Sequence, residues 1–483
     1  MRTAPRPSPL LHLARATALA CASLLAGCAA PRPAEPPPLA RLAPAAWQAP
    51  LPHAGSTARL ADWWRAAGDE TLAALIDAAL AGHPDLAAAQ ARQAQARAQA
   101  DAERAGLLPR LDAAASASRG NTAGAGGAVT TLQAGLQAGW EIDLFGRQRA
   151  LVEAARARAE GAGALAHLAR VSLVADVAAG YHGLRLCQAL LRTARQDADS
   201  RGETARLALI SRDAGFTAPA TAALAEASAA DGRARAAQQA GDCAVRRKAL
   251  VALTGLPGLP EPDLEKKMAP ASAESTPSAI FNIATLPADT LRQRPDVWAA
   301  EREVLAARAE IASADAARWP ALSLAGSIGA LRLRAGGVSQ DFSTWSFGPL
   351  QLALPLFDGG RLAAGQAAAR ARHDEAVARY QAQVREAVRE VETALAQGAS
   401  ARSREADARR AVDGYRQSFD ATQALYRQGM ASLPQLEEAR RNLLAADMAL
   451  SQLLHEQRAA SVALYRAAGG GWQAPVEEPE RHP

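Results

Sequence analysis

An internal repeat of roughly 210 residues limits the fold of this chain more than any other feature. The segment HPDLAAAQARQAQARAQADAERAGLLPRLDAAASASRG matches RPDVWAAEREVLAARAEIASADAARWPALSLAGSIG. Pro84 aligns with Pro295 and Pro109 with Pro320, and both pairs are 211 residues apart. A repeat of this kind indicates that each half of the chain is the same supersecondary unit. Each half shows the pattern of a helix, a strand, a loop, a strand, a long helix, a turn and a second long helix.

A long alternating stretch in each half runs directly into a helical pattern. In the first half apolar side chains fall on every second residue from Thr131 to Phe145, which exceeds the about 5–6 residues of an average strand. The apolar positions are Leu132, Ala134, Leu136, Ala138, Trp140, Ile142 and Leu144, and in the second half Leu350, Leu352, Leu354 and Leu356. Membrane barrel strands need about 9–11 residues and alternate in this way. A half-buried strand of a soluble sheet alternates too, and the length favours the membrane strand.

Polar residues on the opposite face of the first stretch predict a water-filled interior. The candidate lumen residues are Gln133, Gln137, Glu141 and Asp143. Trp140 and Trp345 are candidates for the aromatic girdle at a membrane surface, and packing between protomers is the alternative for both.

The helical pattern after each stretch is unusually long. From Gly146 it continues nearly to Gly215, roughly 65 residues, which corresponds to about 100 Å at 1.5 Å per residue. A similar run joins Gly360 to Gly429. Along this second run apolar residues recur at seven-residue spacing, which predicts a thin coiled-coil seam. The seam residues are Val377, Val384 and Val391, with Tyr380, Val388 and Leu395 between them.

Both long runs end in the same kind of helix reversal. Gly215 is followed by Thr217-x-Pro219, and Gly429 by Ser432-x-Pro434. Gly after the incoming helix, a hydroxyl N-cap and Pro in the first turn of the next helix predict a sharp turn. Cys187 and Cys243 each lie 28 residues from Gly215, so antiparallel helices would bring them level. We expect a disulfide, as an exported chain allows; two buried free thiols are the alternative.

The N-terminus has the pattern of a secretory signal. Basic residues precede a short apolar run, and LAGC ends at Cys28. This resembles a bacterial lipobox, which implies cleavage before Cys28 and a covalent lipid on its thiol; an incidental Cys is the alternative. No later apolar run is long enough to predict a helical membrane span. The expected segments are a signal peptide (1–27), a lipidated tether (28–58), the first repeat (59–262), a connecting segment (263–290), the second repeat (291–472) and a tail (473–483).

Composition excludes several classes of function. The formal net charge of +5 falls to about +2 without the three arginines of the signal, which is too mild for nucleic-acid binding. Metal-ligand spacings, nucleophile elbows and phosphate-binding loops are missing from the sequence. We therefore expect neither an enzyme nor a bound metal, and no cofactor apart from the lipid on Cys28.

The strand count predicts an oligomer. Two halves supply four strands, which cannot close a barrel, and an open sheet edge is not stable in lipid. Two chains would give eight strands, with an interior filled by side chains. Three chains would give twelve strands, the smallest number here that leaves an open passage.

Four motifs together resemble one family. They are GWEIDLFGR with its helix, DTLRQRPDVWAAEREVLAARAEIASADAARWPALSLAGSIG, LPLFDGGR and LVALTGLPG. With the lipobox and the repeat, they are similar to TolC-type outer-membrane efflux factors, in particular the NodT-like lipoproteins of resistance-nodulation-division systems. The resemblance covers residues 55 to 472. It implies a mixed α/β membrane protein, in which a homotrimer shares a 12-stranded β-barrel continuous with a long helical barrel in the periplasm. Helix breaks and the segment near 256–290 would form a mixed α/β belt around it.

The resemblance also implies partners and an aperture. The partners are a periplasmic adaptor, an inner-membrane pump of the same class and outer-membrane lipid; the tunnel would open at the helical tips. The aperture positions map onto Tyr426, Pro434, Gln435, Glu438 and, in the first half, Thr221. Three copies of Glu438 would form an acidic ring that favours cations. A solvated helix charge is the alternative for Glu438, and packing against a neighbouring helix for Tyr426.

We therefore interpret the chain as a passive conduit in the outer membrane that exports small molecules such as drugs or toxic compounds. A metal-cation exporter or a type I secretion channel is the alternative within this fold. A periplasmic coiled-coil lipoprotein without a channel is the alternative outside it, although it would not need strands of membrane-spanning length.

Overall fold

The computed structural model describes residues 36–49, 63–66, 68–121, 128–256, 287–335 and 337–474. The chain divides into two units, residues 1–36 and 37–483, and the second unit contains the helices and strands of the fold. The signal peptide and Cys28 lie outside the described residues, as do most of the connecting segment 263–290 and of the tail 473–483.

The two halves contain the same elements in the same order, as the repeat predicted. The first half comprises α5 (Pro84–Ala105), β1 (Arg110–Asn121), β2 (Ala128–Ile142), α6 (Arg147–Asp213) and α7 (Pro219–Thr254). The second half comprises α10 (Pro295–Ala316), β3 (Ala321–Ala335), β4 (Val338–Ala353), α11 (Arg361–Arg427) and α12 (Leu433–Ala467). Both α6 and α11 have 67 residues, so the long unbroken helices expected from the sequence are present.

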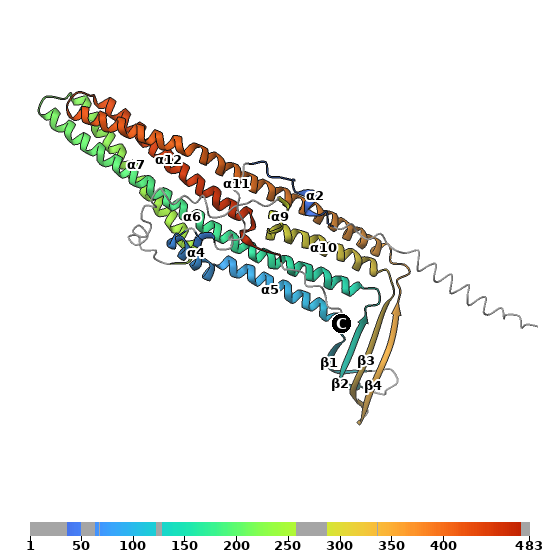
Figure 1. Cartoon of the computed structure of the whole chain (residues 1–483). Coiled ribbons are helices and arrows are strands. Elements are labelled where there is room, and N and C mark those ends of the chain that lie inside the picture. The colour runs from blue at the N-terminus through green and yellow to red at the C-terminus, as the bar shows by residue number, and fades with distance from the viewer. Residues whose placement is uncertain are drawn as a thin grey trace, which may run out of the picture. The chain divides into compact units, whose positions relative to one another are not determined.

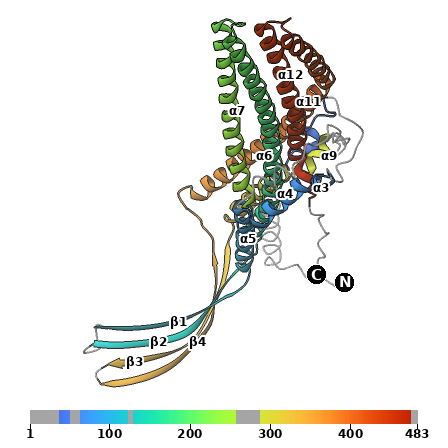
Figure 2. The ribbon, with the colours of Figure 1, turned by 90° about the vertical axis from the view of Figure 1, so that its left-hand side faces the viewer.

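Within residues 37–483 the helices run side by side, and all four strands extend from one end of them (Figures 1 and 2). The α6–α7 and α11–α12 turns lie at the opposite end. The strands form one antiparallel sheet in the order β1-β2-β3-β4. One chain therefore supplies a four-stranded ribbon at one end and two helical hairpins at the other.

Short helices surround the core near the middle of the bundle. They are α2 (Leu39–Leu42), α3 (Trp63–Ala66), α4 (Glu70–Gly82), α9 (Pro287–Arg292) and the 3-10 helix η3 (Gly469–Gly471). The apolar face of α4 belongs to one core cluster with residues of α6 and α12, in which Trp64, Tyr181 and Tyr465 are almost fully buried. The seam of α11 is also present, because Tyr380, Val384 and Val391 are buried. The expected belt is helical where it is described, because α6 and α11 continue through it without a break.

No helical membrane span was expected, and α6 is nevertheless apolar enough over part of its length to pass a composition criterion for one. One window of 18 residues in α6 has the length and hydropathy of a membrane-spanning segment, although 44% of this window is buried inside the protein. The reason is packing: Val171, Val174 and Val177 of α6 lie in the core against α4 and α12. This composition belongs to a core helix and is weak evidence for a membrane span.

The predicted tether begins to fold earlier than expected. Leu39 and Leu42 of α2 pack against the cluster formed by α10 and α11. The backbone N–H groups of Gln48 and Ala49 donate to the Glu392 carboxylate at 2.6 and 2.8 Å. Residues 37–49 therefore lie along α11 instead of forming a free spacer, since their leucines find an apolar partner there.

The sheet is shorter at its helix-proximal end than the alternation suggested. β2 ends at Ile142 and β4 at Ala353, so Asp143, Leu144, Leu354 and Leu356 lie beyond the strands. The pairing of β3 with β4 shifts between Leu324 and Gly326, at a β-bulge in β4. This bulge puts Phe347 and Leu350 on the same face although their numbers differ in parity.

The two helix reversals are less alike than their sequences. Gly215 and Gly429 both adopt left-handed backbone conformations, with φ of 78° and 73°, as expected after a helix C-terminus. Ser432 caps α12 as predicted, and Pro434 is in its first turn. The prediction for Thr217 is wrong: α7 begins at Pro219 with Ala218 as the N-cap residue. The Thr217 hydroxyl instead lies 2.6 Å from that of Ser211 on α6.

Candidate functional site

One face of the sheet is mainly polar, apart from Leu331, Leu333 and Phe342 near the end farthest from the helices. Directly opposite residues on neighbouring strands share a face, and Gln137 lies opposite both Asp112 and Ser327, while Glu141 lies opposite Ser323. Gln133 lies on the same face opposite Ser116. The structure therefore brings three of the four predicted lumen residues together on one polar surface.

The fourth predicted lumen residue, Asp143, has a different role. Its Oδ2 accepts hydrogen bonds from Arg149 N at 2.9 Å and Arg149 Nε at 3.2 Å, so it caps the first turn of α6. The N-cap residue of α6 is Gly146, whose φ is 78°. Because glycine has no side chain to cap the helix, Asp143 supplies the acceptor. Burial of Asp143 raises its pKa, but the hydrogen bonds from Arg149 and Gln148 outweigh that effect and leave the pKa below its ordinary value.

Asp358 does the same at the other junction between sheet and helix. Its carboxylate accepts from Gly360 N at 3.0 Å and from Leu362 N at 2.7 Å. These bonds hold the pKa of Asp358 below its ordinary value. The motifs WEIDLFGR and LPLFDGGR are thus strand-to-helix joints, in which a carboxylate satisfies the free N–H groups of a long helix.

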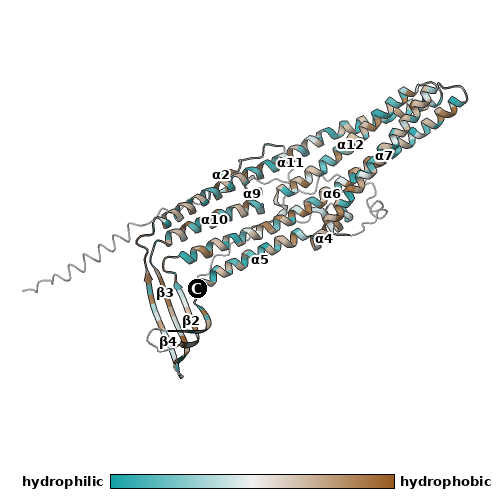
Figure 3. Cartoon of the chain, turned by 180° about the vertical axis from the view of Figure 1, so that it is seen from behind, coloured by the Kyte–Doolittle hydropathy of each residue, from teal (hydrophilic) through white to brown (hydrophobic). Residues whose placement is uncertain are grey.

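The opposite face of the sheet is largely apolar, and none of the residues that the structure describes covers it. Leu136 lies opposite Ile328, and Ile328 opposite Trp345. Ile328 is 61% and Trp345 79% exposed. In Figure 3 hydrophobic and hydrophilic residues are interspersed along the strands, as expected for a sheet with two different faces. Such an apolar surface requires lipid or another protein.

The two candidate girdle residues lie at different depths. Trp140 is near the helix-proximal end of β2, and its Nε1 donates to Leu107 O at 2.9 Å, which suits an interfacial position. Trp345 is near the middle of β4, so its position favours the apolar band over the girdle.

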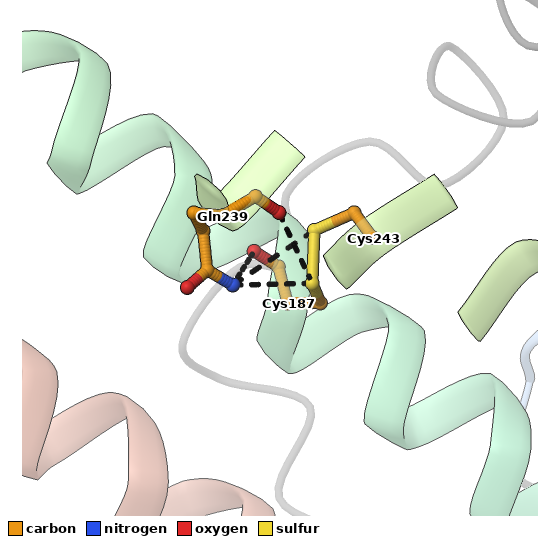
Figure 4. The surroundings of a disulfide bond; sticks show 3 residues. All are labelled: Cys187, Gln239 and Cys243. Atoms are coloured by element: carbon orange, nitrogen blue, oxygen red, sulfur yellow. Dashed lines mark hydrogen bonds between the residues drawn. A yellow bond between two sulfur atoms is a disulfide. The ribbon is translucent and has the colours of Figure 1, made fainter. Parts of the chain in front are cut away.

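The predicted disulfide is present. Cys187 of α6 and Cys243 of α7 are joined, with Cα atoms 5.5 Å apart. Gln239, one turn before Cys243, points its side-chain amide toward the bond and donates to Cys187 Sγ at 3.1 Å (Figure 4). The bond fixes the two helices of the first hairpin in register.

Four of the five predicted aperture residues lie on either side of the α11–α12 turn, and Thr221 lies in the first turn of α7. Pro434, Gln435 and Glu438 are exposed. Gln435 has a structural task, because its Oε1 accepts from Ser432 N at 2.7 Å and completes a capping box. The role of Glu438 at an aperture remains a prediction.

Tyr426 and Thr221 are both half-buried. Tyr426 packs against the alanines of α6 and α7 near Leu433, and burial raises the pKa of its hydroxyl. It also lines a small pocket together with Ser200, Thr204 and Leu436. Thr221 lies in the first turn of α7, where its N–H donates to Ala218 O at 3.0 Å.

A buried ionic cluster close to this turn was not foreseen from the sequence. Arg201 of α6 donates to Asp197 Oδ2 at 2.8 Å and to Glu437 Oε2 of α12 at 2.7 Å. Arg440 of α12 donates to Glu437 Oε1 and, at 3.0 Å, to Thr204 of α6. The cluster therefore links the first-half hairpin to the second-half hairpin.

The cluster is almost completely removed from water. The side chains of Arg201 and Arg440 are 5% and 4% exposed, and those of Asp197 and Glu437 are 6% and 14% exposed. Two positive and two negative charges balance, which buried ions require. Burial nevertheless lowers the pKa of Arg440. The sequence pattern that points to this cluster is the spacing of its charges, because Asp197–Arg201 and Glu437–Arg440 are i,i+4 and i,i+3 pairs of opposite charge.

In the part of the chain that the structure describes, no group of three or more His, Cys, Asp or Glu side chains is placed to hold a metal ion.

These features define a class of protein. A ribbon with one apolar and one polar face, joined through capped junctions to helices of 67 residues, is the protomer of an outer-membrane channel that extends into the periplasm. The chain belongs to the outer membrane efflux protein family, whose model matches residues 75–256 and 286–470. The two matched segments coincide with the two structural repeats.

Individual relatives agree with this assignment. The chain is 33% identical to the outer membrane protein OprJ of Pseudomonas aeruginosa over 420 residues, which is 85% of this chain and 86% of OprJ. It is 32% identical to the toluene efflux pump outer membrane protein TtgI of Pseudomonas putida, over 84% of this chain and 86% of TtgI. It is 29% identical to nodulation protein T of Rhizobium leguminosarum, over 86% of this chain and 85% of nodulation protein T.

Solved structures agree as well. The open-state outer membrane channel MtrE of Neisseria gonorrhoeae superposes with a TM-score of 0.74 at 28% identity, covering 89% of this chain and 95% of MtrE. The outer-membrane channel OprN superposes with a TM-score of 0.73 at 29% identity, covering 86% of this chain and 93% of OprN. The chain is therefore an outer-membrane efflux channel protein.

Proposed function

We propose that three copies of this chain close a 12-stranded barrel and form a passive conduit from the periplasm to the outside. The observation that supports this most strongly is the sheet. Within the described residues its edge strands β1 and β4 each have one paired neighbour, and its apolar face is exposed. The unpaired edges are not stable in a membrane unless copies join edge to edge, whereas the apolar face is the surface that lipid would cover. Three copies give twelve strands with the polar face around the lumen.

The cargo is proposed to be small organic molecules. Relatives are named for pumps that export toluene, solvents and antibiotics, which supports this class of cargo. Energy would come from a separate inner-membrane pump, joined through a periplasmic adaptor at the helical tips. The conduit itself would carry out no catalysis.

The tips are proposed to hold a gate. The buried cluster of Arg201, Glu437 and Arg440 ties the α11–α12 hairpin to α6. Separation of the hairpins would expose two ion pairs to water, where each side chain regains its hydration. Tyr426 and Glu438, on either side of the turn, are proposed to line the aperture.

The N-terminus is proposed to carry a lipid on Cys28. The lipobox-like LAGC sequence supports this, and the anchor would hold the periplasmic face of the protein at the outer membrane.

Reconstitution in planar bilayers tests the conduit. The purified protein should insert as a discrete ion-conducting unit whose mean conductance rises when the tip cluster is disrupted. Absence of conductance from both the native protein and a cluster variant would overturn the proposal.

A further inference from the structure

The apolar face of the sheet ends in arginines at the edge farthest from the helices. Arg119 of β1 lies opposite Thr130 of β2, and Thr130 lies opposite Arg334 of β3. All three therefore share one row on one face. Two residues along β3, Arg332 lies opposite Leu132, which places this row on the apolar face.

The row lies just beyond a band of membrane thickness. On β2 the apolar face runs from Ile142 to Leu132, which spans about 34 Å along the strand at about 3.4 Å per residue. With a strand tilt of about 40°, the height is about 26 Å, close to the about 25 Å apolar band of outer-membrane barrels. Thr130, with Arg119 and Arg334 beside it, is the next position on this face. In the proposed barrel these arginines reach the outer headgroup layer.

The charge in this region is not balanced. Arg332 pairs with Asp341 at 2.6 Å. Arg119 and Arg334 are exposed, and the described residues provide no ion pair for either of them. The loop sequences 122–127 and 336–337 contain only Thr, Ala and Gly. Two positive charges per chain therefore face outward, and six per trimer.

We propose that Arg119 and Arg334 form a docking site for the phosphate of a phosphorylated lipid headgroup in the outer leaflet of the outer membrane. Two strand spacings of about 4.8 Å place the two arginines about 10 Å apart, so both guanidinium groups reach one phosphate between them. Guanidinium binds phosphate through paired hydrogen bonds, and the Thr130 hydroxyl adds a donor. This inference rests on the proposed trimeric barrel, because that assembly turns the face outward.

Native mass spectrometry of the full-length protein in detergent tests the site. The probe is bisphosphorylated lipid A, with dephosphorylated lipid A and inorganic phosphate as the other arms. The native protein should retain bisphosphorylated lipid A, and the double variant Arg119→Gln, Arg334→Gln should retain at least five-fold less. Excess inorganic phosphate should not displace the lipid if the headgroup and acyl chains bind together.

The control variant carries Arg92→Gln and Arg97→Gln. It has the same change of charge, but both residues are exposed on α5, away from the sheet, and lipid retention should be unchanged. Equal retention by the native protein and the Arg119, Arg334 variant would overturn the inference, as would equal binding of dephosphorylated lipid A. If phosphate alone competes fully, the site binds free phosphate and the lipid proposal fails.

Failure of this inference is distinguishable from failure of the barrel. Conductance of the double variant in planar bilayers should match that of the native protein, since the arginines face away from the lumen. A protein that conducts but shows no difference in lipid retention refutes only the lipid site. A protein that neither conducts nor oligomerises refutes the proposed function on which the site depends.

Discussion

Arg201 Nη1 on α6 donates to Glu437 Oε2 on α12 at 2.7 Å, across 236 residues of sequence. This contact joins the two halves of the repeat near the helical tips, in surroundings with little water. Its energetic weight comes from burial, because removing one partner of a buried ion pair leaves the other charge without compensation.

Substitution of Glu437→Gln should loosen the tips. It leaves two buried arginines with one acid, so we expect a loss of about 3 kcal/mol in unfolding free energy and a clear rise in mean conductance in planar bilayers. Glu226→Gln, an exposed acid on α7, should change neither quantity. The double variant Glu437→Gln, Arg440→Gln restores charge balance and should cost less than the sum of the single variants. Additive costs would show that the charges are not coupled.

Glu438→Gln should act on ion selectivity, and it should leave stability unchanged because Glu438 is exposed. A ring of three carboxylates attracts cations, so the reversal potential in a salt gradient should shift toward weaker cation preference. An unchanged reversal potential would remove Glu438 from the aperture.

Loss of the disulfide should weaken the first hairpin. The bond closes a loop with a sequence separation of 56, for which chain entropy gives an upper limit of about 4 kcal/mol. Cys187→Ser with Cys243→Ser should therefore lower the unfolding temperature and speed proteolysis of the α6–α7 hairpin, as should reductant added to the native protein. If reductant also lowers the unfolding temperature of the double variant, the effect of reductant does not come from this disulfide.

The junction carboxylates predict a dependence on pH. Asp143 has a pKa below its ordinary value, so its stabilising effect is present above the unfolded pKa, about 3.9, and is lost as pH falls through the folded pKa. Asp143→Asn keeps a neutral hydrogen-bond acceptor and removes only the negative charge, so it should cost about 0.3–1 kcal/mol at neutral pH. The difference should shrink below about pH 4 in urea titrations. A difference that is independent of pH would argue against the carboxylate cap.

A lipid on Cys28 would change the mass of the N-terminal peptide. Mass spectrometry of the native N-terminal peptide should show cleavage before Cys28 and added acyl chains. Cys28→Ser should give an unacylated chain. An unmodified native Cys28 would refute the anchor.

Local patterns in the sequence predicted the elements of this protein well. Alternation around Leu132 and Leu136 predicted a membrane-length strand, and the valines of α11 predicted its buried seam, because both depend on side-chain period alone. The error at Asp143 has a local cause. Strict alternation extends the predicted strand to Phe145, three residues beyond its end at Ile142, whereas the left-handed turn at Gly146 brings the Asp143 carboxylate to the helix N-terminus.

These local patterns do not predict which helices pack against each other over long distances in the sequence. The Arg201–Glu437 pair depends on how α6 and α12 meet, and no period in either helix encodes the partner. The same limit applies to Trp345, whose depth on the sheet depends on the register of β4 and on its bulge. Only the spacing of Asp197 and Arg201 offered a local hint of the cluster.

The number of chains in the native assembly decides whether the four-stranded sheet closes into a barrel. Native mass spectrometry of the detergent-extracted protein counts them directly. We expect three chains, each contributing the four strands of the described sheet to one closed barrel of twelve. A stable monomer, or a dimer with eight strands that still conducts in planar bilayers, would contradict this expectation.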